Sequence, residues 1–522
     1  IGHTRWATHG EPSDLNSHPH SNGDESISVV HNGIIENYIR LREFLSAQGY
    51  SFKSETDTEV IPHLIDYFYD GDLVQAVLKA LDKMEGSYAL GVVSSKEPDK
   101  LVAVRTDSPL IVGLGQGENF IASDIPAVLN LTRVIYLLND TEVVVLTEAG
   151  VTLLDKTGKE IKRDVYHVTW NADAAEQGGY EHFMLKEIHE QPKVIRDTMT
   201  SRVMLDKPIT LDKITLTKEQ MDSFTKVYIV ACGTAYHAGV VGKYVIEKLA
   251  RIPVEIDIAS EFRYREPLID EKTLMIVISQ SGETADTLAA LREAKAKGAR
   301  VIAVTNVVGS SVSREASDVL YTWAGPEIAV ASTKAYVTQL IAMYIIALFF
   351  AENKGTLSKA QIEDIKREML ALPEKAEEVL KLKDKVKEIA EDTYQHHDMF
   401  YLGRGLDYAV AMEGSLKLKE ISYIHSEAYA AGELKHGPIA LMEKGTVLIT
   451  LATQEYLFDK MVSNIKEVKA RGAYVLSFAF EGNENIEKTV DKAVYLPRTI
   501  DLLAPVLNVI PLQLLSYYIA VK

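Results

Sequence analysis

The sequence contains a single cysteine, Cys232, among its 522 residues. One cysteine cannot form a disulfide framework, and such scarcity is typical of a protein of the reducing cytoplasm. Basic residues are too few to balance the acidic ones, so the formal net charge is −18 at pH 7. This charge argues against nucleic acid or an anionic membrane as a partner, although a local site can still bind a small anion.

Long apolar runs are also scarce. The longest, near residues 336–350, is interrupted by Thr338 and Gln339, and we expect it to be too short to span a membrane. No signal peptide is recognisable, and the chain opens on Ile1-Gly2-His3, so we expect it to begin inside a longer protein. The apolar content of 47% and the charged content of 25% are typical of a soluble globular protein with two or three domains.

Residues 1–170 predict many short strands separated by turn residues. So many consecutive strands favour layered sheets over a doubly wound parallel sheet. A turn is expected at His31-Asn32-Gly33, directly after the first strand. The expected helices are 37–48, 60–69 and 73–84, and the expected strands are 28–30, 88–93, 101–105, 110–113, 120–122, 134–138 and 142–147.

From residue 226 onward the pattern of strands and helices repeats. The strand expected at 227–231 corresponds to one at 399–402, and the strand at 274–278 corresponds to one at 447–451. The intervals are nearly constant, since 399 − 227 = 172 and 447 − 274 = 173. Strands that alternate with helices form parallel sheets covered on both faces, so we predict two doubly wound α/β domains of one fold.

The predicted organisation therefore has five parts. The segment between the repeats should be helical, with a break at Pro373, and the segment before them is a mixed-charge connector with a helix near 183–198. The expected boundaries are 1–172 for the layered domain, 173–217 for a linker, 218–357 for the first repeat, 358–389 for a helical connector and 390–522 for the second repeat.

A phosphate site is predicted after the strand at 274–278. The next loop reads Ser279-Gln280-Ser281-Gly282-Glu283-Thr284 and opens a helix. Three hydroxyls, an amide and the free N–H groups of a helix start can hold an anion, whereas one hydroxyl would only cap the helix. The equivalent loop of the second repeat, 452–457, has one hydroxyl and an added carboxylate, so we expect no phosphate there.

Two other segments are candidates for the same pocket. Gly233-Thr234 follows the first strand of the first repeat, at the sheet edge where open α/β sheets bind ligands. Ser332-Thr333-Lys334 is another hydroxyl-rich helix start. Cys232 has no evident base beside it, so we interpret it as a small buried thiol and not as a nucleophile.

Residues 413–437 concentrate ionisable groups on a segment that otherwise has the pattern of a buried helix and loop. Lys417 and Glu420 are three residues apart and would share a helix face, and His436 follows them. A carboxylate, an ammonium and an imidazole suit proton transfer near neutral pH. A helix with a salt-bridged polar stripe is the alternative interpretation.

The N-terminal region combines several histidines with groups that suit an amino-acid ligand. The histidine spacing matches no firm ligand set, so no metal is predicted. Arg5 and Asp57 would suit the carboxylate and the ammonium of an amino acid, and Asn32 with the Gly33 N–H could form an oxyanion hole. No activated nucleophile is evident for them to serve.

The motifs resemble two known kinds of domain. HTRWATHG, HNGIIEN and SETDTEV resemble the N-terminal-nucleophile (αββα) glutaminase domain of glutamine amidotransferases. CGTAYHA, SQSGETADTL, EIAVASTKAY and LKLKEISYIHSEAYAAGELKHGP resemble paired sugar-isomerase (SIS) domains. In this order they cover essentially the whole chain and resemble the glutamine amidotransferases that act on sugar phosphates.

This resemblance implies a reaction. Nitrogen from L-glutamine would be transferred to D-fructose 6-phosphate, giving D-glucosamine 6-phosphate and L-glutamate, the first committed step of amino-sugar (UDP-GlcNAc) synthesis. The resemblance implies neither a metal nor another cofactor, because an imine supplies the activation. It also implies a cytoplasmic homodimer or higher homo-oligomer, with no nucleic-acid or membrane partner.

The resemblance also implies residue roles in the glutamine site. Arg5 and Asp57 match the residues that hold the α-carboxylate and α-ammonium of glutamine, and Trp6 matches the tryptophan that gates ammonia passage. The residues matched to this site are Arg5, Trp6, Thr8, His9, Asn32, Gly33 and Asp57.

In the isomerase part, Glu420 matches the base that moves a proton between C1 and C2 of the sugar, and Lys417 lies beside it. His436 matches the histidine implicated in ring opening, which the family supplies across a dimer interface. The residues matched to the sugar-phosphate site are Gly233, Thr234, Ser279, Gln280, Ser281, Thr284 and Ser332.

Three departures from the family pattern stand out. The N-terminal Met-Cys-Gly segment with the nucleophilic cysteine and the C-terminal tail with the Schiff-base lysine are not in this sequence, so we expect the chain to lack both groups. Ala235 stands where relatives often carry serine. Two alternatives stay open: an isomerase or deaminase-like enzyme, which would not need the glutamine motifs, and a sugar-phosphate sensor, which would need neither Glu420 nor His436.

Overall fold

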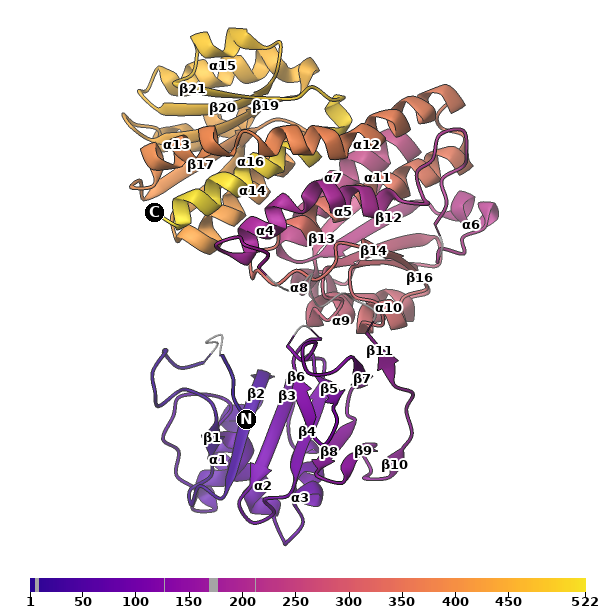
Figure 1. The fold of residues 1–522 in the computed structure, drawn as a ribbon, viewed down its shortest axis with the longest axis vertical. Helices are drawn as coiled ribbons and strands as arrows, with labels where there is room; N and C mark the ends of the chain where they lie inside the picture. Colours follow the sequence, from indigo (N-terminus) through magenta and orange to yellow (C-terminus); the bar gives the residue numbers. More distant parts are fainter. Residues whose placement is uncertain (5–8, 126, 169–176, 212) are drawn as a thin grey trace. The chain divides into compact units, whose positions relative to one another are not determined.

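The computed structural model describes residues 1–4, 9–125, 127–168, 177–211 and 213–522. The chain forms two compact units (Figure 1). The first comprises most of residues 1–174 and the second most of residues 175–522.

The first unit contains two antiparallel sheets. Their strand orders are β1-β2-β3-β4-β8-β9-β10 and β11-β7-β5-β6. The helices among its described residues are α1 (Tyr38–Ala47), α2 (Val60–Phe68) and α3 (Leu73–Leu81). The strands are β1 (His20–Ser21), β2 (Ile27–Ile35), β3 (Gly86–Ser94), β4 (Leu101–Thr106), β5 (Ile111–Leu114), β6 (Asn119–Ala122), β7 (Val134–Leu137), β8 (Val143–Thr147), β9 (Gly150–Leu154), β10 (Glu160–Ile161) and β11 (Tyr166–His167).

These elements form layers because each sheet buries apolar side chains. Helices α2 and α3 place Leu64 and Val77 in a core with Val92 of the large sheet. On a separate core, Val144 of the large sheet packs with Val112 of the small one. The layered sheets predicted from the strand pattern are confirmed, as are the three helices within a few residues at their ends.

The turn predicted at residues 31–33 is wrong. His31, Asn32 and Gly33 lie inside β2 and pair with residues of β3. Gly33 has a φ of +139°, and a Cβ there would lie 2.0 Å from the carbonyl oxygen of Ser87. The glycine that made this segment resemble a turn is therefore required by the close approach of two strands.

The second unit contains two parallel sheets of identical topology. Their strand orders are β13-β12-β14-β15-β16 and β18-β17-β19-β20-β21. This identity confirms the predicted repeat. The strands are β12 (Lys226–Ala231), β13 (Val254–Ile258), β14 (Thr273–Ser279), β15 (Arg300–Thr305), β16 (Asp318–Tyr321), β17 (Asp398–Gly403), β18 (His425–Ala430), β19 (Val447–Ala452), β20 (Tyr474–Phe480) and β21 (Lys492–Leu496).

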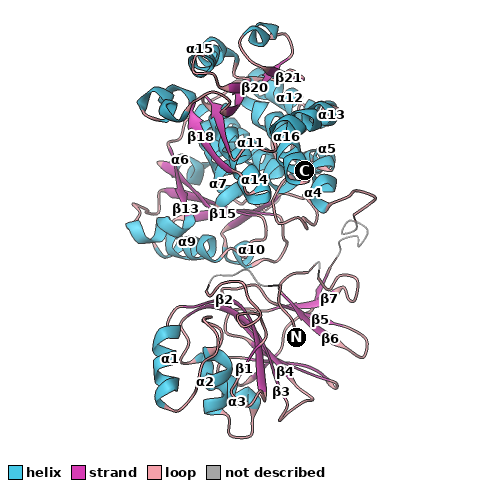
Figure 2. Cartoon of the chain, turned by 90° about the vertical axis from the view of Figure 1, so that its left-hand side faces the viewer, coloured by secondary structure: helices cyan, strands magenta, loops and turns pink. Residues whose placement is uncertain are grey.

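Helices cover both faces of these sheets (Figure 2). In the first repeat, Leu288 of α9 packs with Val277 on one face, whereas α7 and α11 cover the other. The described helices are α4 (Phe183–His189), α5 (Gln191–Met199), α6 (Lys218–Ser223), α7 (Gly233–Ala250), α8 (Ala259–Phe262), α9 (Ala285–Ala296), α10 (Ser311–Glu315), α11 (Lys334–Lys354), α12 (Lys359–Leu380), α13 (Lys383–Thr393), α14 (Leu406–Ser422), α15 (Phe458–Lys469) and α16 (Ala504–Ala520).

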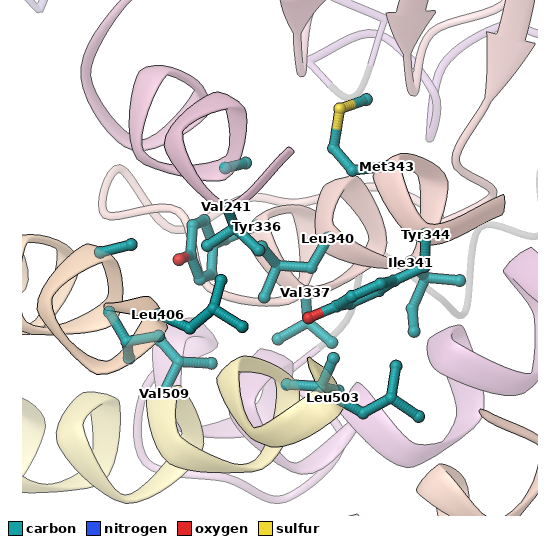
Figure 3. Packing of buried hydrophobic residues seen from close by; sticks show 14 of the residues in the cluster. Val241, Tyr336, Val337, Leu340, Ile341, Met343, Tyr344, Leu406, Leu503 and Val509 are labelled. Atoms are coloured by element: carbon teal, nitrogen blue, oxygen red, sulfur yellow. The ribbon is translucent and has the colours of Figure 1, made fainter. Parts of the chain in front are cut away.

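The two repeats share one core. Figure 3 shows Val241 of α7, Tyr336 and Leu340 of α11, Leu406 of α14 and Val509 of α16 in one cluster. All five side chains are buried. The repeats therefore form one packed body, in which α7 also packs against α14.

Two described segments, Lys334–Lys354 and Asp501–Ala520, are long and apolar enough to cross a membrane by length and composition. The expectation that the run near 336–350 is too short is therefore wrong, because the helix extends beyond that run. However, 89% and 100% of their apolar windows are buried inside the protein. Burial in the shared core accounts for their composition.

The predicted helix break at Pro373 is also wrong. Pro373 lies inside α12, and the helices separate at Lys381-Leu382. Proline removes one backbone donor, but Leu372, Pro373 and Ala376 are buried on the packed face of α12. Packing therefore holds the helix together across the proline.

Residues of the predicted linker pack into the second unit. The single helix expected near 183–198 is two helices, α4 and α5, with Pro192 at the start of α5. Their side chains Met184, Ile188 and Ile195 belong to the shared core. This segment is therefore part of the second unit and contributes to its stability.

Candidate active sites

A hollow of about 250 Å³ in the first unit brings together the described residues of the predicted glutamine site. Arg5, Trp6 and Thr8 lie outside the described residues. The predicted residues that line the hollow are His9, Asn32, Gly33 and Asp57. It is also lined by residues that were not assigned to the site from the sequence: His3, His18, His31, Ile34, Thr56, Thr58 and Ser87.

Asp57 is the buried carboxylate of this hollow. Its Oδ2 accepts a hydrogen bond from the Ile35 N–H at 2.8 Å, and its Oδ1 lies 3.8 Å from Nδ1 of His9. Strand β2 therefore fixes the carboxylate through the backbone of Ile35. The second oxygen lies on the side of His9, where a ligand group could reach it.

The loop that carries Asp57 is held by Glu59. The Glu59 carboxylate accepts hydrogen bonds from the N–H groups of Lys53 at 2.8 Å and Ser54 at 2.6 Å. Burial would raise the pKa of Glu59, but hydrogen bonds from His63, Lys53 and Ser54 lower it to about 2. An ionised carboxylate thus orders the loop at every pH at which an enzyme works.

His31 is a neutral buried imidazole in the same hollow. Its Nδ1 is 2.9 Å from Oγ1 of Thr58. Burial lowers the pKa of His31 to about 4, although the negative charge of Asp57 acts in the opposite direction. Among the described residues, no group of three or more His, Cys, Asp or Glu side chains could hold a metal ion.

The predicted phosphate loop of the second unit lies between β14 and α9, as expected. The Gly282 N–H donates to Ser279 Oγ at 3.0 Å. The carbonyl oxygens of Gln280 and Gly282 accept from the N–H groups of Asn306 at 3.1 Å and Val312 at 3.0 Å. The loop backbone is therefore fixed by the segment that follows β15.

Gly282 is needed for this tight path. Its φ is +67°, and a Cβ would lie 2.1 Å from Ser310 Oγ. Any side chain at this position would displace the neighbouring segment. The loop therefore presents its hydroxyl residues Ser279, Ser281 and Thr284 from one defined backbone conformation at the start of α9.

Glu413 connects the start of α7 with the charged face of α14. Oγ1 of Thr234 donates to its Oε1 at 3.1 Å, and Nδ1 of His237 lies 2.7 Å from its Oε2. Nζ of Lys417, one turn further along α14, lies 3.6 Å from the same Oε1. Sequence reasoning missed Glu413 as a site residue, although its spacing of four residues from Lys417 was a usable signal.

Lys417 and Glu420 form an ion pair whose two ends differ in exposure. The Lys417 side chain is 1% exposed and that of Glu420 is 37% exposed. Burial alone would lower the pKa of Lys417, but Glu413 and Glu420 raise it above its ordinary value. Lys417 is therefore a fixed positive charge, and Glu420 is the carboxylate that a substrate can reach.

Ser332 belongs to a loop that Glu327 organises. Oε2 of Glu327 accepts from Ser332 Oγ at 2.9 Å, and its Oε1 accepts from the N–H groups of Thr333 at 2.9 Å and Ala335 at 3.1 Å. This carboxylate thus caps the start of α11. Lys334, the first residue of α11, pairs with Glu190 of α5's N-cap at 2.6 Å.

A second buried carboxylate, Glu187 of α4, supports the same loop. Its Oε1 accepts from the N–H groups of Ile328 at 2.5 Å and Ala329 at 3.2 Å. Burial and the nearby charge of Glu327 raise the pKa of Glu187 to about 7. No sequence pattern pointed to this residue, because its partners lie far away along the chain, in the loop before α11.

Two further residues discussed from the sequence are His436 and Cys232. His436 ends the 3₁₀ segment η3 (Ala431–His436) and is exposed on the surface of this single chain. Its supply across a dimer interface stays a prediction. Cys232 is half-buried, and burial raises the pKa of its thiol, which supports its interpretation as an unreactive residue.

Known proteins match the whole chain. A glutamine amidotransferase domain model matches residues 3–130, and a SIS domain model matches residues 222–349 and 393–522. The chain is 73% identical over all 522 residues to the glutamine–fructose-6-phosphate aminotransferase [isomerizing] of Clostridium tetani, covering 86% of that protein. It is 50% identical over 521 residues to the enzyme of that name from Thermus thermophilus, again covering 86% of it.

A solved structure gives the same result for the second unit. The C-terminal domain of glucosamine-fructose-6-phosphate aminotransferase from Francisella tularensis superposes with a TM-score of 0.63 at 42% identity, covering 66% of this chain and 98% of that one. The fold is thus that of a glutamine amidotransferase domain followed by paired SIS domains, as the motifs predicted. The chain belongs to the glutamine–fructose-6-phosphate aminotransferase family.

Proposed function

We propose that this protein transfers nitrogen from L-glutamine to D-fructose 6-phosphate and isomerises the product to D-glucosamine 6-phosphate, releasing L-glutamate. We place this reaction in the cytoplasm, at the entry to amino-sugar synthesis. The strongest support within the chain is one combination: a hollow lined by Asn32, Gly33 and Asp57, and a hydroxyl-rich loop in a body that also carries the Lys417–Glu420 pair. An isomerase or a sensor would not need the hollow lined by Asn32, Gly33 and Asp57.

In the glutamine site, Asp57 holds the α-ammonium of the substrate. One of its oxygens is engaged by the Ile35 N–H, and the other is on the side of His9. His31 stays neutral at neutral pH, so it does not repel the ammonium. Asn32 and the Gly33 N–H stabilise the oxyanion that forms when a nucleophile, in the family an N-terminal cysteine, attacks the amide carbon of glutamine. We assign the binding of the α-carboxylate to Arg5, further contacts with glutamine to Thr8 and His9, and the gating of ammonia to Trp6.

In the sugar site, the phosphate lies on the loop after β14. The hydroxyls of Ser279, Ser281 and Thr284 and the amide of Gln280 donate to its oxygens. The start of α9 adds backbone N–H groups and the positive end of its dipole. Gly233-Thr234 and Ser332 line the same pocket from the starts of α7 and α11. The net charge of −18 makes such local donors necessary for an anionic substrate.

Proton transfer is assigned to Glu420, the exposed member of the Lys417–Glu420 ion pair of α14. The Glu420 carboxylate removes a proton from C1 and returns it at C2, and the neighbouring Lys417 ammonium forms an ion pair with that carboxylate. Thr234 donates a hydrogen bond to Glu413, which forms an ion pair with Lys417, so polar contacts connect the start of α7 with the proton-transfer pair. In a homodimer, His436 of a second copy would assist ring opening.

The test is a coupled assay on the full-length protein. We expect one glutamate for each glucosamine 6-phosphate formed from glutamine and fructose 6-phosphate. Asp57→Asn should raise the KM for glutamine and leave the KM for the sugar unchanged, whereas Ser281→Ala should do the reverse. Conversion of fructose 6-phosphate to an aldose phosphate without nitrogen transfer would support the isomerase alternative, and binding without turnover would support the sensor.

A further inference from the structure

Asp407 is a buried carboxylate that the proposed mechanism does not use. It lies in the first turn of α14 and is 2% exposed. Its Oδ2 accepts from the N–H groups of Thr453 at 2.8 Å and Gln454 at 3.3 Å. Its Oδ1 accepts from Thr453 Oγ1 at 2.6 Å, Asn508 Nδ2 at 3.1 Å and Gln454 Nε2 at 3.4 Å.

All five hydrogen bonds come from uncharged donors. A buried carboxylate is costly unless donors replace its water, and five donors around one carboxylate form a complete anion site. Burial raises the pKa of Asp407 to about 6 against the hydrogen bonds from Thr453 and Gln454, so the carboxylate is ionised at neutral pH. The positive end of the α14 dipole adds to this stabilisation.

The donors of Thr453 and Gln454 belong to the loop after β19, which is equivalent to the proposed phosphate loop of the first repeat. Strand β14 ends at Ser279 and β19 ends at Ala452, which gives an interval of 452 − 279 = 173. Thr453 and Gln454 are therefore the counterparts of Gln280 and Ser281. The second repeat has kept a loop that binds an anion, although it has lost most of the hydroxyls.

The carboxylate stands where the first repeat has a methyl group. Gly233 and Gly405 both lie at helix starts and have positive φ values of +53° and +58°. They are separated by 405 − 233 = 172, which matches the interval between the first strands of the repeats. By this interval Asp407 corresponds to Ala235. The first repeat thus has no carboxylate at the position where the second repeat places Asp407.

We propose that Asp407 is a built-in substitute for phosphate: it occupies the anion site of the second repeat and excludes sugar phosphates from it. This inference rests on the proposed function only in taking the loop after β14 as the phosphate loop. It assigns a specificity role to a residue outside the proton-transfer pair. It also predicts that a latent phosphate site exists underneath the carboxylate.

The test uses Asp407→Ala, which reproduces the alanine of the first repeat. It is made in a full-length Ser281→Ala/Thr284→Ala background, so that the first site does not contribute. In chloride buffer we expect its Tm to fall by about 5 °C or more, because five buried donors lose their acceptor. Inorganic phosphate at equal ionic strength should restore at least half of this loss, and formate should restore part of it.

Two controls complete the experiment. Asp459→Ala removes an exposed first-turn carboxylate from α15 and should change neither the Tm nor its phosphate response. Asp407→Asn keeps the shape but points an amide N–H₂ at donors, so it should lower the Tm without a phosphate response. This second variant keeps the inference testable if Asp407→Ala does not fold.

The inference is overturned if phosphate does not stabilise Asp407→Ala. Recovery with formate alone would also overturn it, because the space would then fit a carboxylate and not a phosphate. An Asp407→Asn variant as stable as the parent protein would contradict the anion site itself. Failure of the proposed function would look different: fructose 6-phosphate would not stabilise the protein with an intact first site.

Discussion

The two SIS repeats share a strand order but carry different side chains at equivalent positions. In the first repeat, the proposed phosphate loop is rich in hydroxyls. In the second repeat, the equivalent loop is filled by Asp407. The helices differ as well. By the interval of 172 residues between Gly233 and Gly405, Glu413 and Lys417 of α14 correspond to Val241 and Val245 of α7, and all four are buried.

This difference shows how a duplicated fold can divide one reaction. The sheets and helices fix the positions that functional groups can occupy, and a few side chains determine which chemical group occupies each position. The first repeat has buried valines on α7, Val241 and Val245, and carries the proposed phosphate loop. The second repeat has an occupied anion site and a charged α14. Because α7 packs against α14 and Thr234 bonds to Glu413, we expect the substrate phosphate and the base to lie in one pocket.

The largest expected effect is on proton transfer, which belongs to α14 alone. Glu420→Gln should lower kcat for glucosamine 6-phosphate formation by about 10²–10⁴-fold, because general-base catalysis is lost. The affinity for fructose 6-phosphate should change little. Glu247→Gln on α7 is the matched control, since Glu247 is a partly exposed carboxylate that pairs with Lys243. Equal losses of activity in both variants would contradict the claim that proton transfer belongs to α14 and not to α7.

The next effect is on stability. Lys417→Val gives α14 the residue found in α7 but leaves Glu413 buried without its cation, and should cost about 3–5 kcal/mol of unfolding free energy. Lys417→Val together with Glu413→Val makes α14 like α7 and should be less destabilising than the single change. Urea unfolding measures both. A double variant that is less stable than Lys417→Val would show that the charges stabilise the fold beyond their mutual pairing.

A smaller effect is expected on binding to the first repeat. Ser281→Ala with Thr284→Ala removes two hydroxyl donors to a charged phosphate and should weaken fructose 6-phosphate binding by roughly 10²-fold. Ser463→Ala, on the exposed face of the equivalent helix α15, is the control and should leave the affinity unchanged. Calorimetry that finds wild-type affinity in the double variant would refute the phosphate assignment.

The smallest effect concerns the pH dependence of stability and the loop before α11, which Glu187 supports. The pKa of Glu187 is raised by burial to about 7, so the folded protein favours its protonated form. The stability that this group contributes is present at acidic pH and is lost as pH rises through about 7, by up to about 3 kcal/mol. Glu187→Gln mimics the protonated form and should flatten this fall in stability between pH 5 and 8.

The control for this prediction is Glu181→Gln, which changes an exposed carboxylate just before α4. It should retain the pH dependence of the wild-type protein. If Glu187→Gln instead loses stability more steeply with rising pH, the raised pKa is not the cause.

Much of this molecule could be predicted from local sequence. The near-constant interval between 227–231 and 399–402 predicts the repeat, and three hydroxyls with Gly282 predict the loop after β14 as a ligand-binding loop. Those signals are local: strand, loop and helix start follow one another in the chain. The motifs around Asn32 and Asp57 likewise pointed to residues that the structure places in one hollow.

What could not be predicted depends on long-range packing. Glu187 supports a loop that is distant in the sequence, and Glu413 meets Thr234 across the two repeats. Gly33 resembled a turn residue because its partner strand β3, which makes glycine necessary, follows only after three intervening helices. Pro373 was predicted to end a helix because helix propensity alone takes no account of its buried neighbours, whose packing holds α12 together.

The central claim is that each chain binds one sugar phosphate, in the first repeat, and performs proton transfer from the second. Titration calorimetry of the full-length wild-type protein with fructose 6-phosphate, without glutamine, tests it most directly. The account predicts one equivalent bound per chain, with an affinity about 10²-fold weaker in Ser281→Ala/Thr284→Ala. Two equivalents per chain, or wild-type affinity after both substitutions, would contradict it.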